Sequence, residues 1–191
     1  MPGITNISDF NGEVGNVPGG NYSEFEDDGF IEFHGDARYW MDFNFGGVDL
    51  GTGATAPDLI ALGAGGTIYI RGFDGGVTTE QLFGSFELNH NWAEGTVLKP
   101  HVHWVSTTAD AGNVKWQLTY SLVADGAVAG VGSTIAIISA APVAAWTSVF
   151  AAFPDIATAG LHIGTQVSFR LFRDPTDGDD NYPGDAGFFT F

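Results

Sequence analysis

The chain has 191 residues, 44% of them apolar, which is enough for one folded domain with a sizeable core and too few for two large ones. Lys and Arg total 6 against 23 Asp and Glu, so the formal net charge is −17 and few cations are present to neutralise phosphates, which argues against direct binding to nucleic acid or an anionic membrane. Cys is absent, which removes disulfides, thiolate nucleophiles and cysteine-based zinc sites, and no apolar run reaches the ~18 residues of a membrane-spanning helix.

The first 37 residues differ from the rest because they mix Gly, Asn and Pro with the acidic stretch Glu24 to Asp28 and lack a sustained hydrophobic period. Such a segment is either a solvated terminus or an arm that becomes ordered along a neighbouring subunit. We predict an extended N-terminal arm at 1–37 and a β-sandwich domain at 38–191. The candidate anchors for contact with a neighbouring subunit are the aromatic residues of the arm: Phe10, Tyr22, Phe25, Phe30 and Phe33.

The remainder of the chain carries β signals almost throughout. Residues 113–122 alternate apolar and polar side chains with period two, which is typical of a strand with one solvated face. Shorter runs predict further strands at 38–45, 67–71, 82–88, 97–106, 133–138, 146–153, 166–172 and 186–191. Turn clusters separate these runs, and Pro142 favours a strand and a loop over a helix at 134–145. The expected fold class is all-β, a jelly-roll-like antiparallel β-sandwich with at most short helical turns.

His101 and His103 lie two residues apart on a predicted strand, so both imidazoles project from the same face and could share a metal ion. With Gly95 they match the start of the cupin metal motif, G-x5-H-x-H, but Thr107 and Thr108 occupy the positions where that motif has its Glu. The alternative is structural: the histidines form cross-strand hydrogen bonds or face a subunit boundary, while Val102 and Trp104 pack on the other side. Two ligands alone do not close a tetrahedral site.

A second cluster of charged residues occurs near the C-terminal end. Arg170 and Arg173 precede an acidic, Gly-containing stretch that holds Asp174, Asp180 and Asp185. Such carboxylates could bind calcium, although their spacing does not match an EF-hand loop. We favour ion pairs in which the arginines pin this loop to the last strands.

No sequence motif for catalysis is present. The chain has no G-x-S-x-G, H-E-x-x-H, P-loop or strand-linked G-x-G-x-x-G pattern, and no Cys nucleophile. In so acidic a chain, a pair of carboxylates that hydrolyses glycosides is not excluded by the sequence. However, Glu80, Glu87 and Glu94 give no sign of a shared cleft. We therefore expect no cofactor and no enzymatic activity.

A family resemblance runs over about two thirds of the chain, residues 66–191. The pattern EELxxxxxLPHxWKEGTDLxPHVHW is matched approximately by residues 80–88, His90, residues 94–96 and the segment 99–104 (KPHVHW). The likeness continues in GNVKWQLTY at 112–120 and in RLFRD at 170–174, which is followed by Asp180, Tyr182 and Asp185. This ordered set resembles a family of structural proteins of tailed bacteriophages and prophages. Asn89 stands where the family commonly has Pro, and Ala93 where it has Lys. The resemblance implies a virion component without choosing between head, neck and tail.

Charge and composition narrow that expectation to a capsid decoration, or cement, protein on the exterior of the virion. In this hypothesis the leader binds the major capsid protein, the acidic domain projects outward, and a homotrimer occupies quasi-three-fold sites. The first alternative is a receptor- or glycan-binding module of a head or tail fibre that presents Trp40, Trp92 or Trp146. The second is a cupin-like metal-dependent enzyme centred on His101 and His103.

Overall fold

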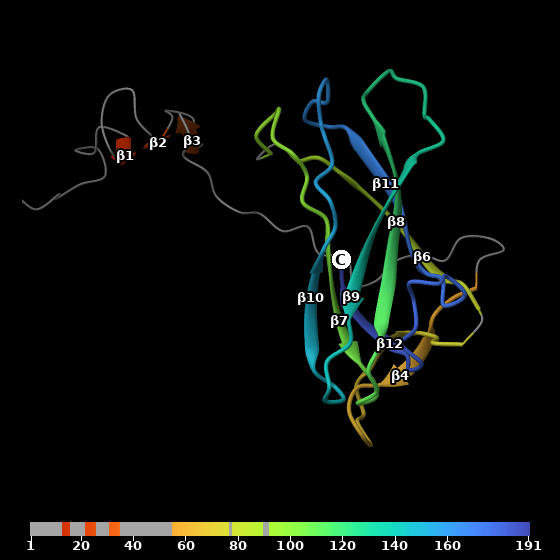
Figure 1. Cartoon of the computed structure of the whole chain (residues 1–191). Coiled ribbons are helices and arrows are strands. Elements are labelled where there is room, and N and C mark those ends of the chain that lie inside the picture. The colour runs from red at the N-terminus through yellow and green to blue at the C-terminus, as the bar shows by residue number, and fades with distance from the viewer. Residues whose placement is uncertain (1–12, 16–21, 26–30, 35–54, 77, 90–91) are drawn as a thin grey trace, which may run out of the picture. The chain divides into compact units, whose positions relative to one another are not determined.

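The computed structural model in Figure 1 describes residues 13–15, 22–25, 31–34, 55–76, 78–89 and 92–191. The chain divides into two units, residues 1–43 and 44–191. Side chains are described in the second unit only, from Thr55 onward.

The described residues of the first unit form three short strands, β1 (Glu13–Gly15), β2 (Tyr22–Phe25) and β3 (Ile31–His34). They pair antiparallel in the order β1-β2-β3, with Val14 opposite Ser23 and Ser23 opposite Phe33. Strands of three and four residues are too short to produce a sustained alternation, which is why the sequence shows none here. The role of residues 1–37 as an arm stays a prediction.

The second unit is an antiparallel β-sandwich, which confirms the all-β prediction, and the described residues contain no helix. One sheet has the order β10-β7-β12-β5-β4 and the other β6-β11-β8-β9. The first sheet comprises β10 (Ser148–Ala152), β7 (His101–Ser106), β12 (Ala186–Thr190), β5 (Tyr69–Phe73) and β4 (Asp58–Ala61). The second comprises β6 (Glu80–Glu87), β11 (Gln166–Arg173), β8 (Asn113–Val123) and β9 (Ser133–Ala140).

Strand β8 follows directly from its alternating sequence. Val114, Trp116 and Leu118 are buried, whereas the residues between them are only partly covered. Every strand predicted between positions 67 and 191 overlaps an observed strand, with ends that differ by a few residues. β4 was not predicted because its four residues carry no clear alternation. The strand predicted at 38–45 lies outside the described residues.

The core between the two sheets is built mainly from aromatic rings. Trp116 of the second sheet meets two rings of the first edge-on, Phe73 at 5.0 Å and Trp104 at 6.2 Å between ring centroids. Trp104 is fully buried and donates its indole N–H to Ser139 Oγ at 3.0 Å, so its one polar atom is paired across the sandwich. Edge-to-face packing of this kind adds about 1 kcal/mol per pair to the stabilisation from burial alone.

The loops between β8 and β9 and between β10 and β11 project from the same end of the sandwich (Figure 1). The β8–β9 loop is rich in Gly, Ala and Val, and Val128 and Val131 on it are almost wholly exposed. This end of the domain therefore offers small apolar side chains to solvent, beside the exposed carboxylate of Asp125 on the same loop.

Candidate functional site

The two histidines of the His-x-His pair project from the outer face of the five-stranded sheet. Val102 and Trp104 alternate with them on β7 and point into the core, both 0% exposed. The rings of His101 and His103 lie 5.2 Å apart between centroids, and Phe150 of the neighbouring strand contacts both, at 4.9 Å and 5.3 Å. Phe150 is 59% exposed. The three rings form one surface cluster, which we call the imidazole face.

No third metal ligand joins this pair among the described residues, where no group of three or more His, Cys, Asp or Glu side chains could hold a metal ion. At the positions of the cupin Glu, Thr107 donates its hydroxyl to the Asp185 carbonyl at 2.8 Å, and the hydroxyl of Thr108 lies 3.1 Å from that of Tyr182. Both threonines thus tie the end of β7 to the segment before β12, and neither is placed as a ligand.

Arg173 occupies a buried site at the end of β11. Its guanidinium forms a bidentate pair with Asp180, at 3.0 Å from Nε and 2.8 Å from one terminal nitrogen, and both side chains are almost fully buried. The remaining N–H groups donate to the carbonyls of Phe73, Gly184 and Tyr182. All five donors of the guanidinium are therefore used, which is the condition under which a buried cation is tolerated.

The acidic loop after β11 is held by a second cation. Lys115 Nζ contacts the carboxylates of Asp177 at 2.9 Å and Asp179 at 3.1 Å, and the backbone N–H of Lys115 donates to Asp180. Hydrogen bonds to the two carboxylates raise the pKa of Lys115, while the N–H of Asp179 and the ammonium lower the pKa of Asp177. Asp174 accepts from the backbone N–H and hydroxyl of Thr176. These contacts tie the acidic loop to β8.

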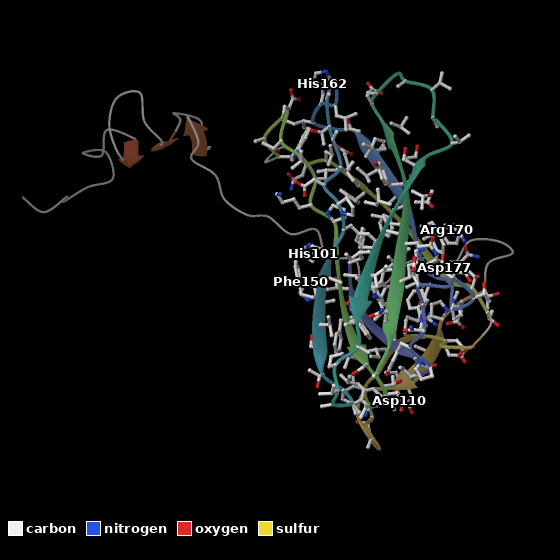
Figure 2. All side chains as sticks on the ribbon, in the orientation of Figure 1. His101, Asp110, Phe150, His162, Arg170 and Asp177 are labelled. Atoms are coloured by element: carbon white, nitrogen blue, oxygen red, sulfur yellow. The ribbon has the colours of Figure 1, made fainter. Side chains whose placement is uncertain are left out.

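Arg170 does not take part in this network, contrary to the expected ion pair. Residues alternate along β11, so Arg173 points into the core and Arg170 to the outer face of the four-stranded sheet. There its guanidinium stacks over the ring of Phe172 at 4.0 Å, and its Nε has no hydrogen-bond partner in the described part of the chain. Burial lowers the pKa of Arg170. Figure 2 places Arg170 and Asp177 across the sandwich from His101 and Phe150.

Glu80 stands in an acidic corner that the sequence did not reveal. Its side chain is buried, and this burial raises its pKa to about 7, with further repulsion from Asp74, Asp58 and Asp185. The backbone N–H of Asp74 donates to the Glu80 carboxylate at 2.6 Å, which opposes the shift. Asp185, expected to form an ion pair with the arginines, also lies in this corner, and burial raises its pKa. It is close enough to Arg173 for their charges to interact, but no hydrogen bond joins the two side chains.

The loop end of the sandwich holds an open pocket of about 430 Å³ between the start of the β8–β9 loop and residues 163–166. Next to it, His162 Nδ1 lies 3.2 Å from the carboxylate of Glu94, which also accepts the backbone N–H of Ile163. These hydrogen bonds lower the pKa of Glu94. His162 is labelled at this end in Figure 2. Among the described residues that line the pocket, only Asp125 has an ionisable side chain.

The tryptophans considered as glycan platforms have different surroundings. Trp92 is 9% exposed and packs against Leu88 and Val167, so it belongs to the core. Trp146 is partly exposed, has a left-handed backbone with φ of 62°, and donates its N–H to the Ser106 carbonyl. Trp40 lies outside the described residues. The anchors predicted in the leader lie outside the described side chains: Phe10, Tyr22, Phe25, Phe30 and Phe33.

No protein-family model, curated protein or solved structure matches this chain. Within the described ranges, no helix is long and apolar enough to cross a membrane.

Proposed function

We propose that the protein is a structural component of a tailed-phage virion, a decoration or cement protein that binds the major capsid protein on the exterior of the head. One observation carries the proposal: the aromatic and ion-pairing residues of the family resemblance that the structure describes lie in the core and hold the fold. Trp104 and Trp116 lie in the core, and Arg173, Asp180 and Tyr182 form the buried network. Residues of this kind stabilise a scaffold, and such a scaffold acts through the surfaces that it presents to other proteins.

The strand order supports a jelly roll. Without β4, the two sheets read β5-β12-β7-β10 and β6-β11-β8-β9, so the chain passes between sheets at every connection except the β8–β9 hairpin. Eight strands in two Greek keys define the jelly roll, an architecture used by viral capsid proteins, lectins and cupins. The fold is thus compatible with a virion role. Because capsid proteins, lectins and cupins share it, the choice among these three functions depends on the side chains.

The surfaces available for partners are apolar patches in a strongly acidic chain. The outward positions of β7 and β10 hold no Asp, Glu, Lys or Arg. Those at least partly exposed are His101, His103, Ser148, Phe150 and Ala152, whereas Val105 is buried. At the loop end Val128 and Val131 are exposed. Uncharged patches with an aromatic centre are suited to subunit contact, and they let a molecule of charge −17 approach another copy in a homotrimer.

A receptor- or glycan-binding module of a fibre is the second candidate, and the exposure of Phe150 favours it. An exposed ring flanked by two imidazoles offers a stacking surface and hydrogen-bonding nitrogens to a sugar. A cupin-like enzyme has less support, since the described residues give the histidine pair no third ligand.

Capsids assembled with and without the protein test the cement role. The proposal predicts that capsids lacking the protein rupture at a lower temperature than complete capsids. When the salt concentration is lowered stepwise, they should also rupture at an earlier step, and added protein should restore their durability. Deleting residues 1–37 is expected to abolish capsid attachment while the sandwich stays folded. Equal durability of both capsids would contradict the cement role, and retained attachment would assign the contact to the sandwich.

A further inference from the structure

The rings of His101 and His103 converge on one another. Residues two apart on a strand are separated by about 6.6 Å along the backbone, and parallel side chains would keep that spacing. The ring centroids lie only 5.2 Å apart, with the ring planes at 82°. The two imidazoles therefore lean together above the sheet.

That separation matches two imidazoles on one metal ion. A zinc ion lies about 2.0 Å from the ligating ring nitrogen and hence about 3 Å from the ring centre. Two rings that share the ion at a tetrahedral angle then have their centres about 5 Å apart. The distance between His101 and His103 needs little adjustment to reach this arrangement.

The hydrogen bonding of His101 leaves the ring nitrogen that a metal requires. Its Nδ1 lies 3.2 Å from the carbonyl oxygen of Lys99. A carbonyl only accepts hydrogen bonds, so Nδ1 is the donor, and in the neutral ring Nε2 carries the lone pair. Metal-binding histidines commonly donate their other N–H to a backbone carbonyl in this way, which fixes both tautomer and orientation.

We propose that His101 and His103 form a two-imidazole site for a divalent transition metal ion of the zinc class. The ion binds on the outer face of the five-stranded sheet, beside the exposed ring of Phe150, and its remaining positions face solvent or a bound partner. Imidazole nitrogen favours zinc, nickel or copper over magnesium and calcium, which prefer oxygen. This inference does not depend on the virion role.

Titration calorimetry of the untagged full-length chain with zinc chloride tests the site, with magnesium chloride as the comparison. We expect one zinc ion per chain at physiological ionic strength and no matching signal from magnesium. His101→Gln and His103→Gln should each weaken zinc binding at least about tenfold, because either change leaves a single imidazole. Circular dichroism should show that both variants keep the fold.

His162→Gln is the matched control, because it removes an exposed imidazole that is paired with Glu94 at the loop end. This variant should bind zinc as the wild type does. Zinc binding that survives in the His101→Gln and His103→Gln variants would overturn the proposal, as would the absence of zinc binding to the wild type. Equal signals from magnesium and zinc would also overturn it, since they would reflect the negative charge of the chain.

Discussion

The Arg173 network and the imidazole face use polar side chains in opposite ways. Arg173 and Asp180 are almost fully buried, and every N–H of the guanidinium has a partner within the chain. On the outer face of the five-stranded sheet, the His101 and His103 rings are only partly covered and stand beside Phe150, which is 59% exposed. Polar groups in the first region hold the fold together, whereas those in the second remain open to an external partner.

This difference predicts which substitutions change stability and which change binding. The charged C-terminal cluster has the composition expected of an ion-binding site, but its carboxylates are engaged by Lys115, Arg173 and backbone N–H groups. The imidazole face has few internal hydrogen bonds to lose. Substitutions in the first region should therefore change unfolding, and substitutions in the second should change binding.

Asp180→Ala should produce the largest loss of stability. Removing one partner of a buried ion pair leaves Arg173 uncompensated, so we expect the free energy of unfolding to fall by about 3–5 kcal/mol. Chemical denaturation measures this change. Asp155→Ala is the matched control, because it breaks the half-exposed pair with Lys99 and should cost no more than about 1 kcal/mol. Equal losses for the two variants would break the distinction between the network and ordinary surface pairs.

Glu80→Gln should produce an intermediate effect that depends on pH. The folded chain holds the Glu80 proton up to a pKa of about 7, whereas the unfolded chain releases it near the ordinary value of 4.5. Between these values the folded state binds more protons, so the stability contributed by protonated Glu80 is present at low pH and is lost as pH rises through about 7. The glutamine mimics the neutral acid and avoids this loss.

The gain of the Glu80→Gln variant over the wild type should therefore be small near pH 5 and reach the order of 2 kcal/mol above pH 8. Denaturation curves of both proteins across this range measure it, and the comparison cancels the opposite contributions of Asp177 and Glu94, whose pKa values are lowered. A gain that does not change with pH would show that Glu80 is ionised in the folded protein at all these values.

The sequence predicted the sandwich because the buried residues of its long strands alternate, most clearly in β8. It also placed His101 and His103 on one face, since that follows from the period of a strand. It did not predict the acidic corner, because Glu80 and Asp185 lie far apart in the chain and meet only through the fold. For the same reason Phe150 was not recognised as the neighbour of the histidines, a contact that depends on the pairing of β10 with β7.

The sequence also could not distinguish the two arginines of RLFRD. Both were expected to pair with the loop carboxylates, but an odd spacing on a strand sends Arg170 and Arg173 to opposite faces. Only Arg173 is buried with Asp180. The alternation itself follows from the sequence, but which face of β11 is buried depends on the core, where Phe169 and Leu171 of the Arg173 face pack.

Phe150→Ala should have the smallest effect on stability. The ring is largely exposed, so we expect a change within about 0.5 kcal/mol in the free energy of unfolding. The same variant should weaken attachment to a second copy, measured by analytical ultracentrifugation, or to immobilised glycans, because the proposed capsid contact lies in residues 1–37 and not in the imidazole face. Val128→Ala, at the loop end, is the control. Unchanged attachment of Phe150→Ala with loss in Val128→Ala would move the binding surface to the loop end.

The proposal that this chain is a decoration protein is tested most directly by the number of copies per purified particle, measured by quantitative mass spectrometry against the major capsid protein. A decoration protein that occupies the quasi-three-fold positions of the head should be present in a fixed, high ratio to the major capsid protein. A few copies per particle would indicate a fibre or neck component instead, and absence from purified particles would contradict a virion role altogether.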